Sequence, residues 1–175
     1  VNLITWGDPD YEKFATAWHI VGDTQTAASF ADVAAAFEGR IGGGTGIGIA
    51  IGYGITLIET SGLAATRKVV DVSGDGTELG EIRVPRFRVE HAAAMREAHG
   101  VIVNGLAIRN DVSDLDAYYR SHVAGGPGSF VIFIDRYEDY AEAIHRKLLR
   151  EILPPSAALQ ARQRLAGSVR ERGSR

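Results

Sequence analysis

Two side chains with oxygen donors, Thr45 and Asp75, stand in glycine-rich turns where a ligand could approach the backbone. Thr45 follows the glycines of GRIGGGTG at residues 39–46, and Asp75 lies within DVSGDG at residues 71–76. A hydroxyl and a carboxylate suit Mg²⁺, which takes hard oxygen ligands and keeps several waters. Both residues also have ordinary structural roles, because threonine caps helices and aspartate before glycine favours a turn. From residue types alone, both interpretations stay open.

The glycine cluster lacks the spacing of a phosphate-binding loop. A dinucleotide fingerprint needs G-x-G-x-x-G directly after a strand, and no register of GGGTGIGIAIGYG provides the third glycine. A Walker A loop needs a lysine before its serine or threonine, and this stretch has none. Phosphate binding is therefore a weak interpretation of the cluster.

Other catalytic chemistries have less support in the sequence. Ser73 stands two residues after Asp71, but the G-x-S-x-G signature of a nucleophile elbow is absent. Sequence order alone leaves a Ser-His-Asp set open. The chain has no cysteine, which excludes disulfides, thiolate metal sites and a cysteine nucleophile. The histidines are scattered and are interpreted as surface or partly buried residues: His19, His91, His99, His122 and His145.

Apolar strands alternating with helices must position these residues. This pattern predicts a doubly wound α/β fold with a mostly parallel sheet and helices on both faces. In such a sheet, ligands bind beyond the carboxyl ends of the strands, which is where Asp75 falls. We expect strands at residues 1–6, 14–21, 68–72, 101–109 and 128–135, and helices at residues 24–38, 45–62, 87–100, 114–123 and 137–153.

Length and composition bound the classes of protein that remain. With 175 residues, we expect one domain over residues 1–153 and a basic, disordered tail over residues 154–175. The net charge of -3 gives no global basic field, so no nucleic-acid partner is expected. No apolar run reaches the roughly 18 residues of a membrane span, and no signal peptide is recognised.

Several blocks of the chain resemble a known family. The strings TRKVVDVSGDG, VIVNGLAI, DLDAYYRSHVAGGPGSFVI and YEDYAEAIHRKLLREI, in that order, are similar to a bacterial family of unknown function with a von Willebrand factor A-like fold. The resemblance covers nearly the whole chain as far as Leu153. It implies a non-enzymatic protein-binding domain, located in the periplasm or at the cell surface.

The resemblance also implies a metal-ion-dependent adhesion site. Thr45 matches the threonine of the second ligand loop and Asp75 matches the aspartate of the third. The ion would be Mg²⁺ or Mn²⁺, and a carboxylate from a protein partner would complete its coordination. Asp71 and Ser73 would be neighbours that act through water or by orienting the ligands.

The sequence departs from this family pattern at its start. No D-x-S-x-S loop precedes Thr45, and the chain opens where the family's second strand would begin. The family's central first strand would lie between residues 1–6 and 68–72, so we expect these two segments to pair directly. Two other functions stay open, namely a small hydrolase or nucleotide-dependent enzyme using the same rim, and a truncated structural remnant without metal.

Overall fold

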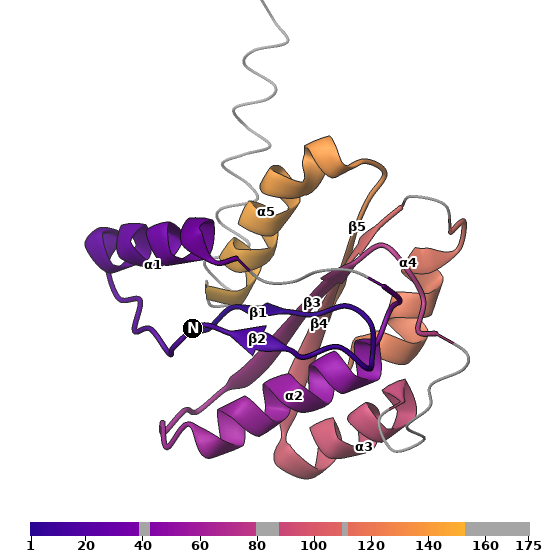
Figure 1. Cartoon of the computed structure of the whole chain (residues 1–175), viewed down its shortest axis with the longest axis horizontal. Helices are drawn as coiled ribbons and strands as arrows, with labels where there is room; N and C mark the ends of the chain where they lie inside the picture. Colours follow the sequence, from indigo (N-terminus) through magenta and orange to yellow (C-terminus); the bar gives the residue numbers. More distant parts are fainter. Residues whose placement is uncertain (39–42, 80–87, 110–111, 153–175) are drawn as a thin grey trace, which may run out of the picture.

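The computed structural model describes residues 1–38, 43–79, 88–109 and 112–152, and it confirms the expected α/β class (Figure 1). A three-stranded parallel sheet is combined with helices on both of its faces. In chain order the elements are β1 (Ile4–Thr5), β2 (Phe14–Ala15), α1 (Thr24–Ala36), α2 (Ile47–Thr60), β3 (Lys68–Gly74), α3 (Val89–His99), β4 (Val101–Ile108), α4 (Leu115–Tyr118), η2 (Tyr119–Val123), β5 (Val131–Ile134), η3 (Tyr137–Asp139) and α5 (Tyr140–Ile152).

The parallel sheet has the order β3-β4-β5. Gly74, the last residue of β3, pairs with Ala107, and Ile108 at the end of β4 pairs with Ile134 at the end of β5. Because the strands are parallel, their carboxyl ends meet at one edge of the sheet. This edge, which we call the rim, receives the turn that holds Asp75.

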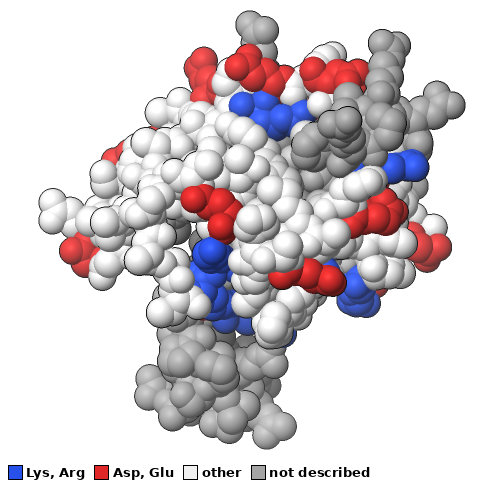
Figure 2. Space-filling model, turned by 90° about the horizontal axis from the view of Figure 1, so that it is seen from below, with Lys and Arg blue, Asp and Glu red and all other residues white. Residues whose placement is uncertain are grey.

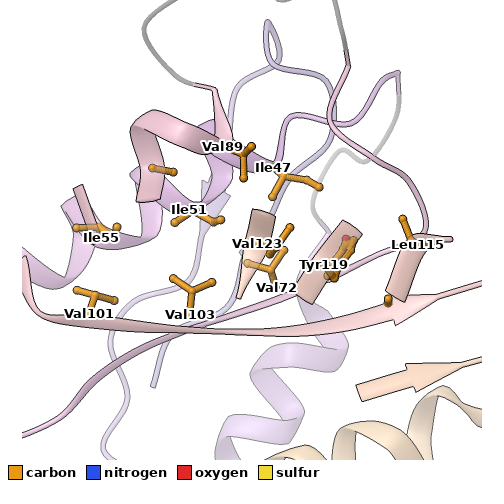
Figure 3. Close-up of a cluster of buried hydrophobic side chains, with 12 residues drawn as sticks. Ile47, Ile51, Ile55, Val72, Val89, Val101, Val103, Leu115, Tyr119 and Val123 are labelled. Atoms are coloured by element: carbon orange, nitrogen blue, oxygen red, sulfur yellow. The ribbon is translucent and has the colours of Figure 1, made fainter. Parts of the chain in front are cut away.

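One face of the sheet packs against α2 and α3 (Figure 3). The apolar period of α2 directs Ile51 and Ile55 toward Val103 and Val101 of β4, and Ile47 joins the same cluster near Val72. Gly54 lets α2 approach β3 closely, because a Cβ atom there would lie 3.3 Å from Val70 Cγ2. This close packing offsets the cost of about 1 kcal/mol that each helical glycine carries relative to alanine.

The other face of the sheet packs against α5. Alternation along β4 turns Leu106 and Ile108 to this side, where they meet Ile134 of β5 and Ala143 of α5. Asp71 and Asn104 are register partners in the middle of β3 and β4, and they share this face. The face is therefore apolar near the rim and polar farther back.

The N-terminal segment differs from the expectation. The strand predicted over residues 14–21 is only Phe14–Ala15, and it forms an antiparallel hairpin with Ile4–Thr5. The predicted direct pairing of residues 1–6 with 68–72 is wrong, because the hairpin is a separate two-stranded sheet. The Leu3 carbonyl accepts a hydrogen bond from the Thr16 N–H at 2.9 Å. Backbone groups of residues 1–6 are thus paired within the hairpin.

Some expectations fall outside the described residues. These are the stop of α1 at Gly39, the stop of α5 at Pro154–Pro155, and the tail over residues 154–175. None of the helices within the described ranges combines the length and apolar character that crossing a membrane requires. On the face seen in Figure 2, acidic and basic side chains are interspersed.

Candidate metal centre

Thr45 lies on the rim immediately before α2. Gly46, which has no side chain, occupies the N-cap position of this helix, so Thr45 is not its N-cap residue. The Thr45 carbonyl accepts a hydrogen bond from the Leu79 N–H at 3.0 Å, which fastens this loop to the segment after β3. The Thr45 side chain is half-buried.

The turn after β3 brings Asp75 to the same place. A Cβ atom at Gly76 would lie 2.8 Å from Thr45 Oγ1, a separation that real Cβ atoms essentially never show. Only glycine lets the turn pass so close to the hydroxyl. The structure therefore places Thr45 beside the residue that follows Asp75, although the two loops are thirty positions apart in sequence.

The Asp75 side chain is exposed on the rim and has a defined hydrogen-bond partner. The Tyr137 hydroxyl donates to Asp75 Oδ2 at 2.6 Å from the short helix η3. The hydrogen bond to Asp75 raises the pKa of Tyr137 to about 12, because it stabilises the protonated phenol. Burial and the charge of the carboxylate make smaller contributions. This contact ties the segment after β5 to the turn after β3.

A second tyrosine lies beneath the same turn. Tyr119 is fully buried, and its hydroxyl has no hydrogen-bond partner among the described residues. A Cβ atom at Gly74 would lie 2.6 Å from this hydroxyl and 3.2 Å from the Trp6 ring. Burial raises the pKa of Tyr119, and the nearby Asp75 charge adds to the effect. The side chains of Tyr119 and Trp6 therefore lie directly beneath the turn at the rim.

The β1–β2 hairpin contributes a carboxylate that the sequence interpretation missed. Asp8 Oδ2 accepts a hydrogen bond from the Gly44 N–H at 3.1 Å, next to Thr45. Asp8 Oδ1 accepts from the Asp10 N–H at 2.9 Å, as is typical of an aspartate that opens a turn. The string GDPD signalled the turn, but nothing in it indicated contact with a loop 36 positions away.

Glu78 is a second residue that sequence reasoning missed. Its two carboxylate oxygens accept hydrogen bonds from the Gly48 N–H at 3.0 Å and the Val89 N–H at 2.6 Å. These donors belong to the first turns of α2 and α3, where backbone N–H groups have no partner within the helix. Burial raises the pKa of Glu78, and the two N–H bonds partly offset this shift. Glu78 thus joins the starts of two helices beside Thr45.

Asp71 and Ser73 lie farther back along β3. Asp71 Oδ1 is 3.1 Å from Lys147 Nζ on α5, and about 10 Å of strand separates Asp71 from Gly74. Ser73 is partly buried and shares the α5 face by strand alternation. The structure therefore brings Thr45 and the Asp75 turn together and places Asp71 in contact with α5 instead.

The rim offers a small set of hard oxygen donors. Thr45 supplies a hydroxyl and Asp75 a carboxylate, which match the ligand preference of Mg²⁺. Among the described residues, no three His, Cys, Asp or Glu side chains are grouped so that they could hold a metal ion. Two protein donors would leave most positions of an octahedral ion to water or to other ligands.

Comparison with protein-family models gives a match over most of the chain. The model of the family described as "Protein of unknown function (DUF1194)" matches residues 1–156. No curated protein and no solved structure matches the chain.

Proposed function

Since the chain belongs to this family of unknown function, DUF1194, we propose its function from the chemistry of the rim. The protein is a non-enzymatic protein-binding domain of von Willebrand factor A type. It recognises a carboxylate of a protein partner through Mg²⁺ or Mn²⁺, with Thr45 and Asp75 as ligands. The observation that carries the proposal is the 2.8 Å approach of Thr45 Oγ1 to the Cβ position of Gly76, beside Asp75.

The donor arrangement supports this role. Asp75 Oδ2 already accepts the Tyr137 hydroxyl, so Oδ1 is the oxygen that Asp75 offers to a cation. Thr45 presents its hydroxyl from a loop that is fixed through its own carbonyl. A divalent cation would supply an electrophilic centre for the partner's carboxylate, since hard cations prefer oxygen ligands. With two protein donors, affinity depends on the partner's contribution.

The location belongs to the same proposal. The resemblance to exported von Willebrand factor A-like proteins supports a place in the periplasm or at the cell surface. Partner recognition through a cation suits that location, because it needs no nucleotide or redox cofactor.

Thermal unfolding tests the proposal, because a ligand that binds only the folded state raises the apparent stability. We expect Mg²⁺ or Mn²⁺ to raise the Tm of the chain, and acetate, as a carboxylate probe, to add to the shift only when the cation is present. Asp75→Ala and Thr45→Val should remove the cation response.

Asp32→Ala is the matched control, because Asp32 is an exposed carboxylate on α1. It should respond to the cation as the parent chain does. If neither cation changes the Tm of the parent chain at millimolar concentration, or if Asp75→Ala responds equally, the proposal fails.

A further inference from the structure

Four polar side chains meet between the last turn of α5 and the sheet. Lys147 is 1% exposed, and its Nζ lies 3.1 Å from Asp71 Oδ1 in the geometry of an ion pair without hydrogen-bond alignment. Asn104 is fully buried and donates from Nδ2 to Glu151 Oε1. Its Oδ1 accepts the Phe130 N–H at 3.1 Å, which fixes the orientation of the amide.

The charges of this cluster do not balance when every group is ionised. Asp71 and Glu151 would carry two negative charges, and Lys147 would carry one positive charge. Lys147 and Asn104 are buried, Glu151 is partly buried, and the Asp71 side chain is 29% exposed. A net charge beside buried groups is costly, whereas one proton on the two carboxyl groups makes the cluster neutral. Burial first, and then the Asp71 carboxylate, raise the pKa of Glu151 to about 8. Burial lowers the pKa of Lys147, against the attraction of Asp71.

The last turn of α5 depends on polar contacts. Leu148 is 45% exposed and Leu149 is 36% exposed, so these two leucines bury little apolar surface at this turn. Arg67 Nη1 donates to the Glu151 carbonyl at 2.8 Å, and the Arg150 guanidinium lies 4.0 Å from the centre of the Phe130 ring. The cluster of Asp71, Asn104, Lys147 and Glu151 is therefore a main attachment of this turn to the sheet.

We propose that Asp71 and Glu151 bind one proton between them, and that its release to solvent loosens the last turn of α5 from the sheet. With the proton bound, one carboxyl group donates to the other and Lys147 neutralises the remaining charge. Without it, two carboxylates face a single ammonium, that of the buried Lys147. The other charged groups at this turn are Arg67 before β3 and Arg150 on α5; Lys68 is engaged with Glu59 at 2.6 Å.

The direction of the pH effect follows from the raised pKa of Glu151. An acid whose pKa is higher in the folded state than its ordinary 4.5 contributes stability that is complete below pH 4.5. That contribution is lost as the pH rises toward about 8. One linked proton changes the folding equilibrium constant by up to about tenfold per pH unit within this window.

Urea unfolding of the whole chain between pH 5 and pH 9 tests the linkage. The parent should lose folding free energy with rising pH, and Glu151→Gln, which is neutral at every pH, should flatten this dependence. Glu142→Gln is the matched control, because Glu142 is an exposed acid on the same helix, with 76% of its side chain exposed. If Glu151→Gln and the parent show the same pH dependence, the proposal is overturned.

Two further measurements keep the test decisive if Glu151→Gln does not fold. Infrared spectra of the parent should show a protonated carboxyl band near pH 6 that disappears by pH 9, and its absence near pH 6 would overturn the proposal. Hydrogen exchange should show the amides of residues 147–151 losing protection relative to β4 over the same range. Asp71→Asn should move that loss to a different pH; an unchanged profile in this variant would count against a shared proton.

Discussion

The Tyr137 hydroxyl donates a 2.6 Å hydrogen bond to Asp75 Oδ2, so the segments that follow β3 and β5, the two outer strands of the described parallel sheet, are joined at the rim. The bond leaves one carboxylate oxygen for a ligand and limits how the Asp75 side chain can turn. Tyr137 is therefore a positioning residue for the proposed cation site.

Removing this hydrogen bond should weaken the cation site without abolishing it. Tyr137→Phe deletes the donor and retains the ring, and an exposed hydrogen bond of this kind contributes about 0.5–1.5 kcal/mol. We expect a cation affinity several-fold lower than that of the parent in calorimetric titration. Tyr140→Phe, which alters a nearby exposed tyrosine, should leave the affinity unchanged. Equal affinity in Tyr137→Phe and the parent would show that Tyr137 does not position Asp75.

The hydrogen bond between Tyr137 and Asp75 also predicts a change in the pKa of Tyr137 that can be measured without a cation. Asp75 raises the pKa of Tyr137 to about 12, so Asp75→Asn should return that pKa toward the ordinary value of 10. Because the pKa is raised by folding, the contact stabilises the protein below pH 10 and the effect is lost as the pH rises through about 12. The measurement is a ¹³C NMR titration of labelled tyrosine. A Tyr137 pKa near 10 in the parent would contradict the contact.

Glycine should be essential at position 76, where the turn passes close to the Thr45 hydroxyl. In Gly76→Ala, the added Cβ would lie 2.8 Å from Thr45 Oγ1 and must displace the hydroxyl or the turn. We expect the cation-dependent Tm shift to disappear, with a loss of about 1–3 kcal/mol in the free energy of unfolding. Gly22→Ala is the control, because no atom lies within 4 Å of its Cβ position. A cation response retained in Gly76→Ala would exclude the proposed geometry.

Removing the Glu78 carboxylate should lower the stability of the protein. Glu78→Ala leaves the Gly48 and Val89 N–H groups without their acceptor at the starts of α2 and α3. Loss of a helix-start acceptor costs about 0.5–2 kcal/mol, and here two helices are affected. Urea unfolding should show a loss of about 1–3 kcal/mol, whereas Glu90→Ala, at an exposed acid on α3, should change little. A loss below about 0.5 kcal/mol in Glu78→Ala would contradict this role.

The sequence predicted the parallel sheet and the meeting of its loops because those features depend on periodicity and topology. The continuous apolar run of VIVNGLAI predicts a strand buried on both faces, and β4 confirms it. Parallel strands then require the turn of Asp75 to reach the rim. The placement of Thr45 beside Gly76 follows the same rule.

Contacts between distant side chains could not be predicted in this way. Lys147 stands in a helix rich in charged residues, where lysine is normally exposed, and only the three-dimensional arrangement places it against Asp71. The alternation of FATAWHIV indicated a longer strand than Phe14–Ala15. Thr16 Oγ1 accepts the Leu3 N–H at 3.0 Å, so a side chain replaces a backbone partner where the ladder ends.

Paramagnetic NMR with Mn²⁺ tests the central claim most directly, because broadening of amide signals reports where the ion binds. In the ¹⁵N-labelled chain, substoichiometric Mn²⁺ should broaden first the amides of Thr45, Asp75 and Gly76, and excess Mg²⁺ should restore them. The same experiment on Asp75→Ala should show no such focus. Broadening centred elsewhere in the parent chain, or none at millimolar Mn²⁺, would contradict a divalent-cation site at the rim.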